Sequence, residues 1–106
     1  MKQIIYAPEV VDDLVDLIDI LVKEGYLYTF EDASQYVQDI LHHFRKNVEV
    51  YPVKHAPSIF SRYGQDLKCL PYKRNQRTTW YIIFAEYADT YHVVNITNNH
   101  VAAQYF

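Results

Sequence analysis

The sequence contains few of the residues that interrupt or cross-link a chain. Of its 106 residues, two are glycine, four are proline and one is cysteine. A single cysteine excludes an intramolecular disulfide and fits a reducing cytosol. Because half of the residues are hydrophobic and glycine is scarce, a disordered or low-complexity chain is excluded as well. We therefore expect one domain over residues 1–106, since a chain of this length forms a single core.

Long hydrophobic runs are also missing. No stretch approaches the roughly eighteen apolar residues that mark a membrane span. The first six residues lack the apolar segment of a secretion signal. The sequence therefore predicts a cytoplasmic protein without a membrane partner.

Positive charge is scarce in the first part of the chain and common in the rest. Residues 1–40 contain two lysines against nine Asp and Glu, whereas residues 41–106 contain eight Lys and Arg against four acids. The overall charge of −3 argues against nucleic acid as a partner. The uneven distribution leaves that class of partner open, because a local basic surface is enough to attract phosphate.

The first half of the chain has the pattern of one strand and two helices. Residues 2–6 favour a short strand, and Pro8 suits the first turn of a helix that Gly25 ends. Thr29, followed by Asp32, resembles a capping pair for a second helix that ends at Asn47. The apolar residues recur at helical spacing in both segments: Val10, Leu14, Leu17 and Leu21, then Ala33, Val37, Ile40 and Phe44. The short link between the segments favours an antiparallel helical hairpin.

The second half has the pattern of an antiparallel sheet. We predict an irregular connector over 48–58, an edge or bulged strand over 67–73, a central strand over 78–86, a returning strand over 91–97 and a short helical tail over 100–106. Pro71 weakens the first of these strands, while both faces of the second are apolar. The predicted class is therefore α+β in the order β-α-α-β-β-β, with a helical hairpin packed on a small, mainly antiparallel sheet.

A basic cluster precedes the central strand. Lys68, Lys73, Arg74 and Arg77 have no acidic residue among them. Lysine and arginine side chains bind phosphate oxygens, and the forked guanidinium group of arginine can bind two of these oxygens at once. Each of the four could instead be a solvated turn residue, but as a group they favour phosphate binding.

The tail supplies candidate catalytic groups. His100 can act as an acid or a base near neutral pH, and Tyr105 can stack on a base or orient a 2′-hydroxyl. Tyr105 and Phe106 could instead pack the tail onto the sheet. The neighbouring pair His42 and His43 points in two directions on a helix, so we expect no metal site.

Several of these segments together resemble one protein family. The helical hairpin, the stretch 64–74, the strand pair 79–84 with 91–96, and the tail 100–105 are together similar to the RelE/ParE superfamily of type II toxin–antitoxin toxins. The resemblance implies plasmid stabilisation or a related toxin role, a cognate antitoxin as partner, and no cofactor. It also implies a metal-independent, ribosome-dependent mRNA endoribonuclease, with His100 as acid–base, Arg74 and Arg77 as phosphate clamps helped by Lys73, and Tyr105 orienting RNA.

Two other functions stay open. Many nucleolytic relatives carry an arginine at the end of the last strand, where this chain has Asn98 and Asn99. That departure favours a ParE-type inhibitor of DNA gyrase, which cleaves nothing and acts through the helical hairpin. A degenerate toxin-fold interaction module is the third alternative. The nuclease hypothesis requires that the basic residues and the tail line one concave pocket.

Overall fold

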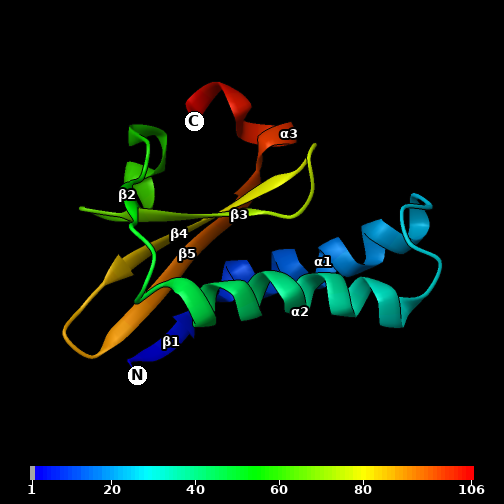
Figure 1. Cartoon of the computed structure of the whole chain (residues 1–106), viewed down its shortest axis with the longest axis horizontal. Coiled ribbons are helices and arrows are strands. Elements are labelled where there is room, and N and C mark those ends of the chain that lie inside the picture. Colours follow the sequence, from blue (N-terminus) through cyan, green and yellow to red (C-terminus); the bar gives the residue numbers. More distant parts are fainter. Residues whose placement is uncertain (1) are drawn as a thin grey trace.

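A computed structural model describes residues 2–106, apart from the side chain of Ala103 (Figure 1). The main elements are β1 (Gln3–Tyr6), α1 (Pro8–Lys23), α2 (Phe30–Asn47), β2 (Lys54–His55), β3 (Lys68–Lys73), β4 (Thr79–Glu86) and β5 (Thr90–Asn98). The 3₁₀ helix η1 (Ser58–Tyr63) lies between β2 and β3, and the tail consists of α3 (Asn99–Ala102) and η2 (Ala103–Tyr105). This confirms the predicted α+β class and element order.

The five strands form one mixed sheet. Their order is β1-β5-β4-β3-β2, in which β1 runs parallel to β5 and the other neighbours are antiparallel. β4 is central, as its two apolar faces indicate. Helices α1 and α2 cover one face, whereas η1 and the tail lie over the opposite face (Figure 1). We call this opposite side the open face.

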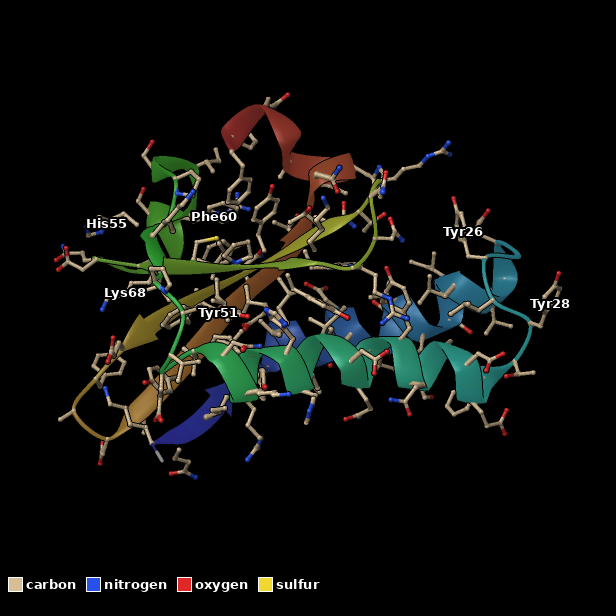
Figure 2. The ribbon with its side chains drawn as sticks, viewed as in Figure 1. Tyr26, Tyr28, Tyr51, His55, Phe60 and Lys68 are labelled. Carbon is tan, nitrogen blue, oxygen red and sulfur yellow. The ribbon has the colours of Figure 1, made fainter. Side chains whose placement is uncertain are left out.

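The predicted helix signals are present in the structure. Pro8 begins α1, and Gly25 follows its end with a φ of 75°, a left-handed conformation that glycine adopts without strain. The Thr29 hydroxyl accepts a hydrogen bond of 3.0 Å from the Asp32 N–H and so caps α2. The loop between the helices carries Tyr26 and Tyr28 at the far tip of the hairpin (Figure 2).

The core has one layer on each side of the sheet. Between the helices and the sheet, the Phe44 ring meets the edge of Phe84 with ring centres 5.1 Å apart. On the open face, a smaller cluster contains Phe60, Leu67, Cys69, Ile83 and Ala85. Neighbouring residues of β4 thus enter different layers, because side chains alternate along a strand.

The connector predicted over 48–58 is not wholly irregular, because it contains β2. Lys54 lies opposite Cys69, and His55 lies opposite Lys68, so β2 covers only the start of β3. Pro71 lies beyond this pairing, on the part of β3 that is an edge of the sheet, where a missing N–H breaks no ladder hydrogen bond. Over the described residues, neither long helix is apolar enough to cross a membrane.

Candidate functional site

The tail is fixed to the β3–β4 turn by asparagine side chains. Asn75 shapes the turn, because its side-chain oxygen accepts hydrogen bonds of 2.9 Å from the N–H groups of Arg77 and Thr78. Asn99 joins the tail to this turn: it accepts from the Thr79 N–H at 2.9 Å and donates to the Arg77 carbonyl at 3.0 Å. Asn98 caps the tail helix by accepting from the His100 N–H at 2.9 Å. Asn98 and Asn99 therefore hold the tail in place.

This arrangement brings two of the predicted site residues together. His100 Nε2 lies 3.0 Å from the Thr78 hydroxyl, one residue from Arg77. The side chains of Arg77 and His100 are both exposed. The turn and the tail thus form a basic rim at one end of the sheet.

Beyond this rim, the tail passes over the open face and forms one wall of a cleft of about 370 Å³. We call it the open-face cleft; it is lined by Lys54, His55, Pro57, Cys69, Pro71, Thr79, Tyr81, Tyr105 and Phe106. Tyr105 therefore lies in a concave site. Phe106 packs onto the sheet, because its ring stacks on Tyr81 with ring centres 3.7 Å apart and planes 4° apart.

The charge of the open-face cleft suits an anion. Lys54 and His55 are exposed at its β2 wall, and no carboxylate side chain is among the described residues that line it. Lys73 lies directly opposite Thr79 in the sheet, so its side chain shares the face of the cleft. Burial raises the pKa of the Cys69 thiol to about 12, which keeps this residue a neutral thiol.

Arg74 lies on the other side of the sheet, so the expectation of one shared pocket is wrong for this residue. Its guanidinium donates to Asp39 at 2.6 Å and to the Tyr72 hydroxyl at 3.1 Å, and it lies 4.5 Å from the centre of the Tyr36 ring. Hydrogen bonds from Gln35 and Arg74 lower the pKa of Asp39, so this carboxylate stays charged beside the arginine. The contacts tie β3 to α2, because Nη1 of Arg74 donates to groups of both elements.

Lys68 is also outside the cleft. It lies six residues before Arg74, roughly 20 Å away at about 3.3 Å per strand residue. Its ammonium group forms a 2.6 Å ion pair with Glu86, which pairs in turn with Lys2 at the same distance. Lys68 thus joins β3 to β4 at the end of the sheet far from the tail.

Sequence reasoning missed Lys54, His55 and Tyr81 as members of the site. Lys54 and His55 form a strand of two residues, which is too short for an alternating pattern to reveal. Tyr81 was identified as part of a strand, but nothing in the sequence shows that the tail would reach it. A basic pair between Pro52 and Pro57 is the signal that could have drawn attention to β2.

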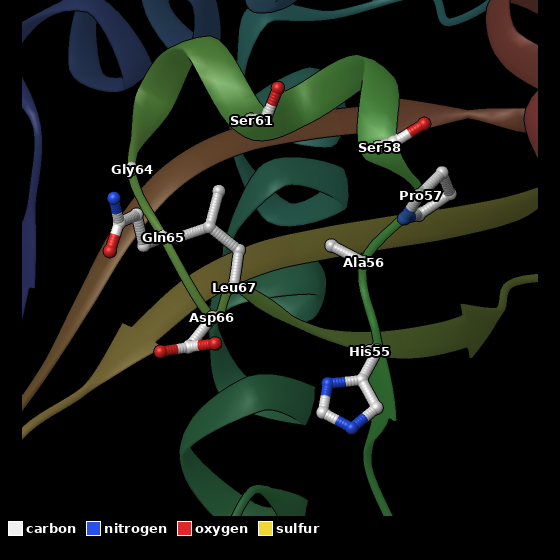
Figure 3. A pocket seen from close by; sticks show the side chains of 9 residues that line it. All are labelled: His55, Ala56, Pro57, Ser58, Ser61, Gly64, Gln65, Asp66 and Leu67. Atoms are coloured by element: carbon white, nitrogen blue, oxygen red, sulfur yellow. The ribbon is translucent and has the colours of Figure 1, made fainter.

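A second hollow of about 480 Å³ lies beside the cleft and shares His55 and Pro57 with it (Figure 3). Its walls come from one segment, residues 55–67, which the 2.8 Å hydrogen bond from the Ala56 N–H to the Leu67 carbonyl closes into a loop. Asp66 contributes a carboxylate to its lining. That negative charge disfavours phosphate, so the open-face cleft is the better candidate site.

Helix α2 places a histidine, His43, against β3, where burial favours its neutral form. His43 Nε2 donates to the Pro71 carbonyl at 3.2 Å, while Nδ1 accepts from the Asn47 amide at 3.1 Å. Its ring stacks on Tyr72 with ring centres 4.4 Å apart. Burial lowers the pKa of His43, because the charged form loses hydration there.

We therefore expect the stability of the protein to fall as the solution becomes acidic. Between the lowered folded-state pKa of His43 and its ordinary value of about 6.5, the unfolded chain binds more protons than the folded one. The contribution of His43 is complete above that window and is lost as the pH falls through it. Thermal unfolding at about pH 7.5 and about pH 5 should show a larger loss in the wild type than in His43→Gln. His42→Gln, at the exposed neighbouring position, should behave like the wild type; equal losses in all three proteins would contradict the assignment.

No family model, no curated protein and no solved structure matches this chain. The site is therefore defined by its own chemistry. It offers cations at its edge, a histidine in its wall and the flat faces of tyrosine rings. These groups are suited to an extended anion that carries planar rings.

Proposed function

We propose that this chain is a toxin of the RelE/ParE type that binds RNA in the open-face cleft and cleaves it. The main support for the proposal is the composition of the cleft: Lys54 and His55 line it together with Tyr81 and Tyr105, and the described lining holds no carboxylate side chain. A helical hairpin on one face of a small sheet, with a short tail after the last strand, is also the arrangement that the family resemblance implies.

The proposed reaction uses groups that line the cleft, together with Lys73, which shares the same face of the sheet. The 2′-hydroxyl of one nucleotide attacks the adjacent phosphorus, a 2′,3′-cyclic phosphate forms, and the bond to the 5′-oxygen of the next nucleotide breaks. His55 accepts the 2′-hydroxyl proton, and the Tyr105 hydroxyl gives a proton to the leaving 5′-oxygen. Proton transfer from His55 through water then restores Tyr105. Lys54 and Lys73 stabilise the negative charge that the phosphate gains in the transition state.

Arg77 and His100 have a different role in this scheme. They lie on the rim at the β3–β4 turn, where they extend the positive surface toward the next phosphates. Arg74 and Lys68 stabilise the fold through their ion pairs with Asp39 and Glu86.

The partner proposed for this toxin is a cognate antitoxin protein that binds the helical side. The outer surface of α1 exposes Val11 and Val15 among the acidic residues Asp12 and Asp16. An apolar surface with acidic neighbours fits a partner segment that carries both apolar and basic side chains.

One observation favours the alternative of a gyrase inhibitor. The tip of the helical hairpin exposes Tyr26, Tyr28 and Phe30, with Tyr28 97 % accessible. Figure 2 shows Tyr26 and Tyr28 projecting away from the rest of the molecule. Aromatic side chains of this kind are common where one protein binds another, so the tip could contact a target protein.

Induction of the wild-type gene in a bacterium tests the proposal directly. We expect growth arrest with cleaved transcripts, and relief of the arrest when a cognate antitoxin encoded beside the gene is expressed with it. Arrest with intact transcripts and damaged DNA would instead support gyrase inhibition. Unimpaired growth would contradict both toxin functions and would support the third alternative, a degenerate toxin-fold interaction module.

A further inference from the structure

The stack of Phe106 on Tyr81 is the closest ring pair among the described residues. Its ring centres are 3.7 Å apart and its planes differ by 4°, whereas the next closest pair, His43 with Tyr72, has 4.4 Å and 22°. Nearly parallel rings in van der Waals contact are also the geometry in which an aromatic side chain stacks on a nucleobase. The Phe106 ring thus occupies the position that a base would take.

The Tyr81 ring is held more rigidly by the fold than the Phe106 ring. Tyr81 belongs to the central strand and lies between Pro71 of β3 and Thr97 of β5. Phe106 follows the short helix η2, the residue is 42 % exposed, and its other aromatic neighbour is Phe60 at 5.9 Å. Tyr81 is therefore a fixed platform, whereas Phe106 can move away without breaking a strand.

Polar groups surround the platform on several sides. Lys54 and His55 lie on the β2 wall, Thr79 lies two residues before Tyr81 on the same face, and Tyr105 immediately precedes Phe106. A cation beside a flat ring matches the two parts of a nucleotide, its phosphate and its base. A purely structural stack would need no such neighbours.

From this geometry we propose that the face of Tyr81 is a stacking site for an unpaired RNA base, which Phe106 occupies until RNA displaces it. The inference rests on the proposed function and specifies how RNA is bound at that site. Phe106 acts as an internal competitor. The apparent affinity for RNA therefore decreases as the fraction of molecules in which Phe106 covers Tyr81 increases.

Equilibrium binding of a fluorescently labelled, mixed-sequence single-stranded RNA of about eight nucleotides tests the inference. Phe106→Ala should bind about threefold to tenfold more tightly than the wild type, because the competing ring is removed. In that background, Tyr81→Leu should weaken binding about tenfold, since leucine preserves apolar bulk but has no ring face. Tyr28→Ala removes an exposed ring far from the cleft and should bind like the wild type. Thermal unfolding of each variant verifies that it is folded.

The outcomes separate this inference from the proposed function. Equal RNA affinity in the wild type, Phe106→Ala and the double variant would overturn the stacking site but retain an RNA-binding protein. Failure of every folded variant to bind RNA would overturn both. Independently, the Phe106 ring protons of the wild type should lose the ring-current shift from Tyr81 when RNA is added; unchanged shifts at saturation would overturn the displacement.

Discussion

Replacing His55 with alanine is expected to lower RNA cleavage about 100-fold or more, because the variant loses the group proposed to accept the 2′-hydroxyl proton. Lys54→Ala should reduce cleavage by about the same order, since it removes a cation that stabilises the transition-state phosphate. Both residues are exposed members of a two-residue strand, so neither substitution removes a core contact. The measurement is the extent of transcript cleavage after induction at matched protein levels.

Matched variants at the helical side provide the control. His42→Ala and Lys46→Ala change the same residue types at exposed positions of α2, and we expect them to cleave RNA like the wild type. Arg74→Ala should reduce stability through its lost contact with Asp39 but preserve cleavage at a temperature where it is folded. If His100→Ala abolished cleavage while His55→Ala did not, the acid–base role would belong to the tail histidine.

Replacing Phe44 with alanine is expected to destabilise the protein by about 3–5 kcal/mol, the usual range for removing a buried phenylalanine side chain. Phe44 is fully buried and lies at the centre of the contact between α2 and the sheet, where its ring meets the edges of Phe84 and Tyr91. The substitution leaves a cavity that the packed rings cannot close. Chemical denaturation followed by circular dichroism measures the free energy of unfolding.

Phe30→Ala is the matched control, because Phe30 is a phenylalanine of the same helix but is 66 % exposed. Its effect should stay within about 0.5 kcal/mol, as is usual for surface substitutions. If Phe30→Ala and Phe44→Ala lost similar amounts of stability, the loss would come from a change in the helix itself and not from the lost core contact.

The fold was predictable wherever a local pattern was strong. The capping hydroxyl of Thr29, Gly25 after the first helix and the two apolar faces of β4 each correspond to a feature of the structure. β2 was not predictable, because its two residues become a strand only by pairing with Cys69 and Lys68. The parallel pairing of β1 with β5 likewise joins segments that are far apart in the chain.

The candidate site was predictable only in part. The sequence pointed to Lys73, Arg77, His100 and Tyr105, which lie at the rim, in the cleft or on its face. It could not separate Arg74 from Lys73, although the two are neighbours, because successive side chains near a strand end point to opposite faces. Nor could it show that Asn98 and Asn99 fix the tail, since an asparagine forms its bonds with groups brought near by folding.

The helices, the main strands and the basic character of the second half follow from residues close together along the chain, so they can be read from the sequence. Which cations remain free depends instead on how the elements pack in space. The tertiary structure directs Arg74 toward Asp39 and Lys68 toward Glu86, and it brings the tail to Lys54, His55 and Tyr81. Ion pairs and stacked rings form only between groups that lie a few ångströms apart, and the spacing of residues along the sequence does not specify which groups come that close.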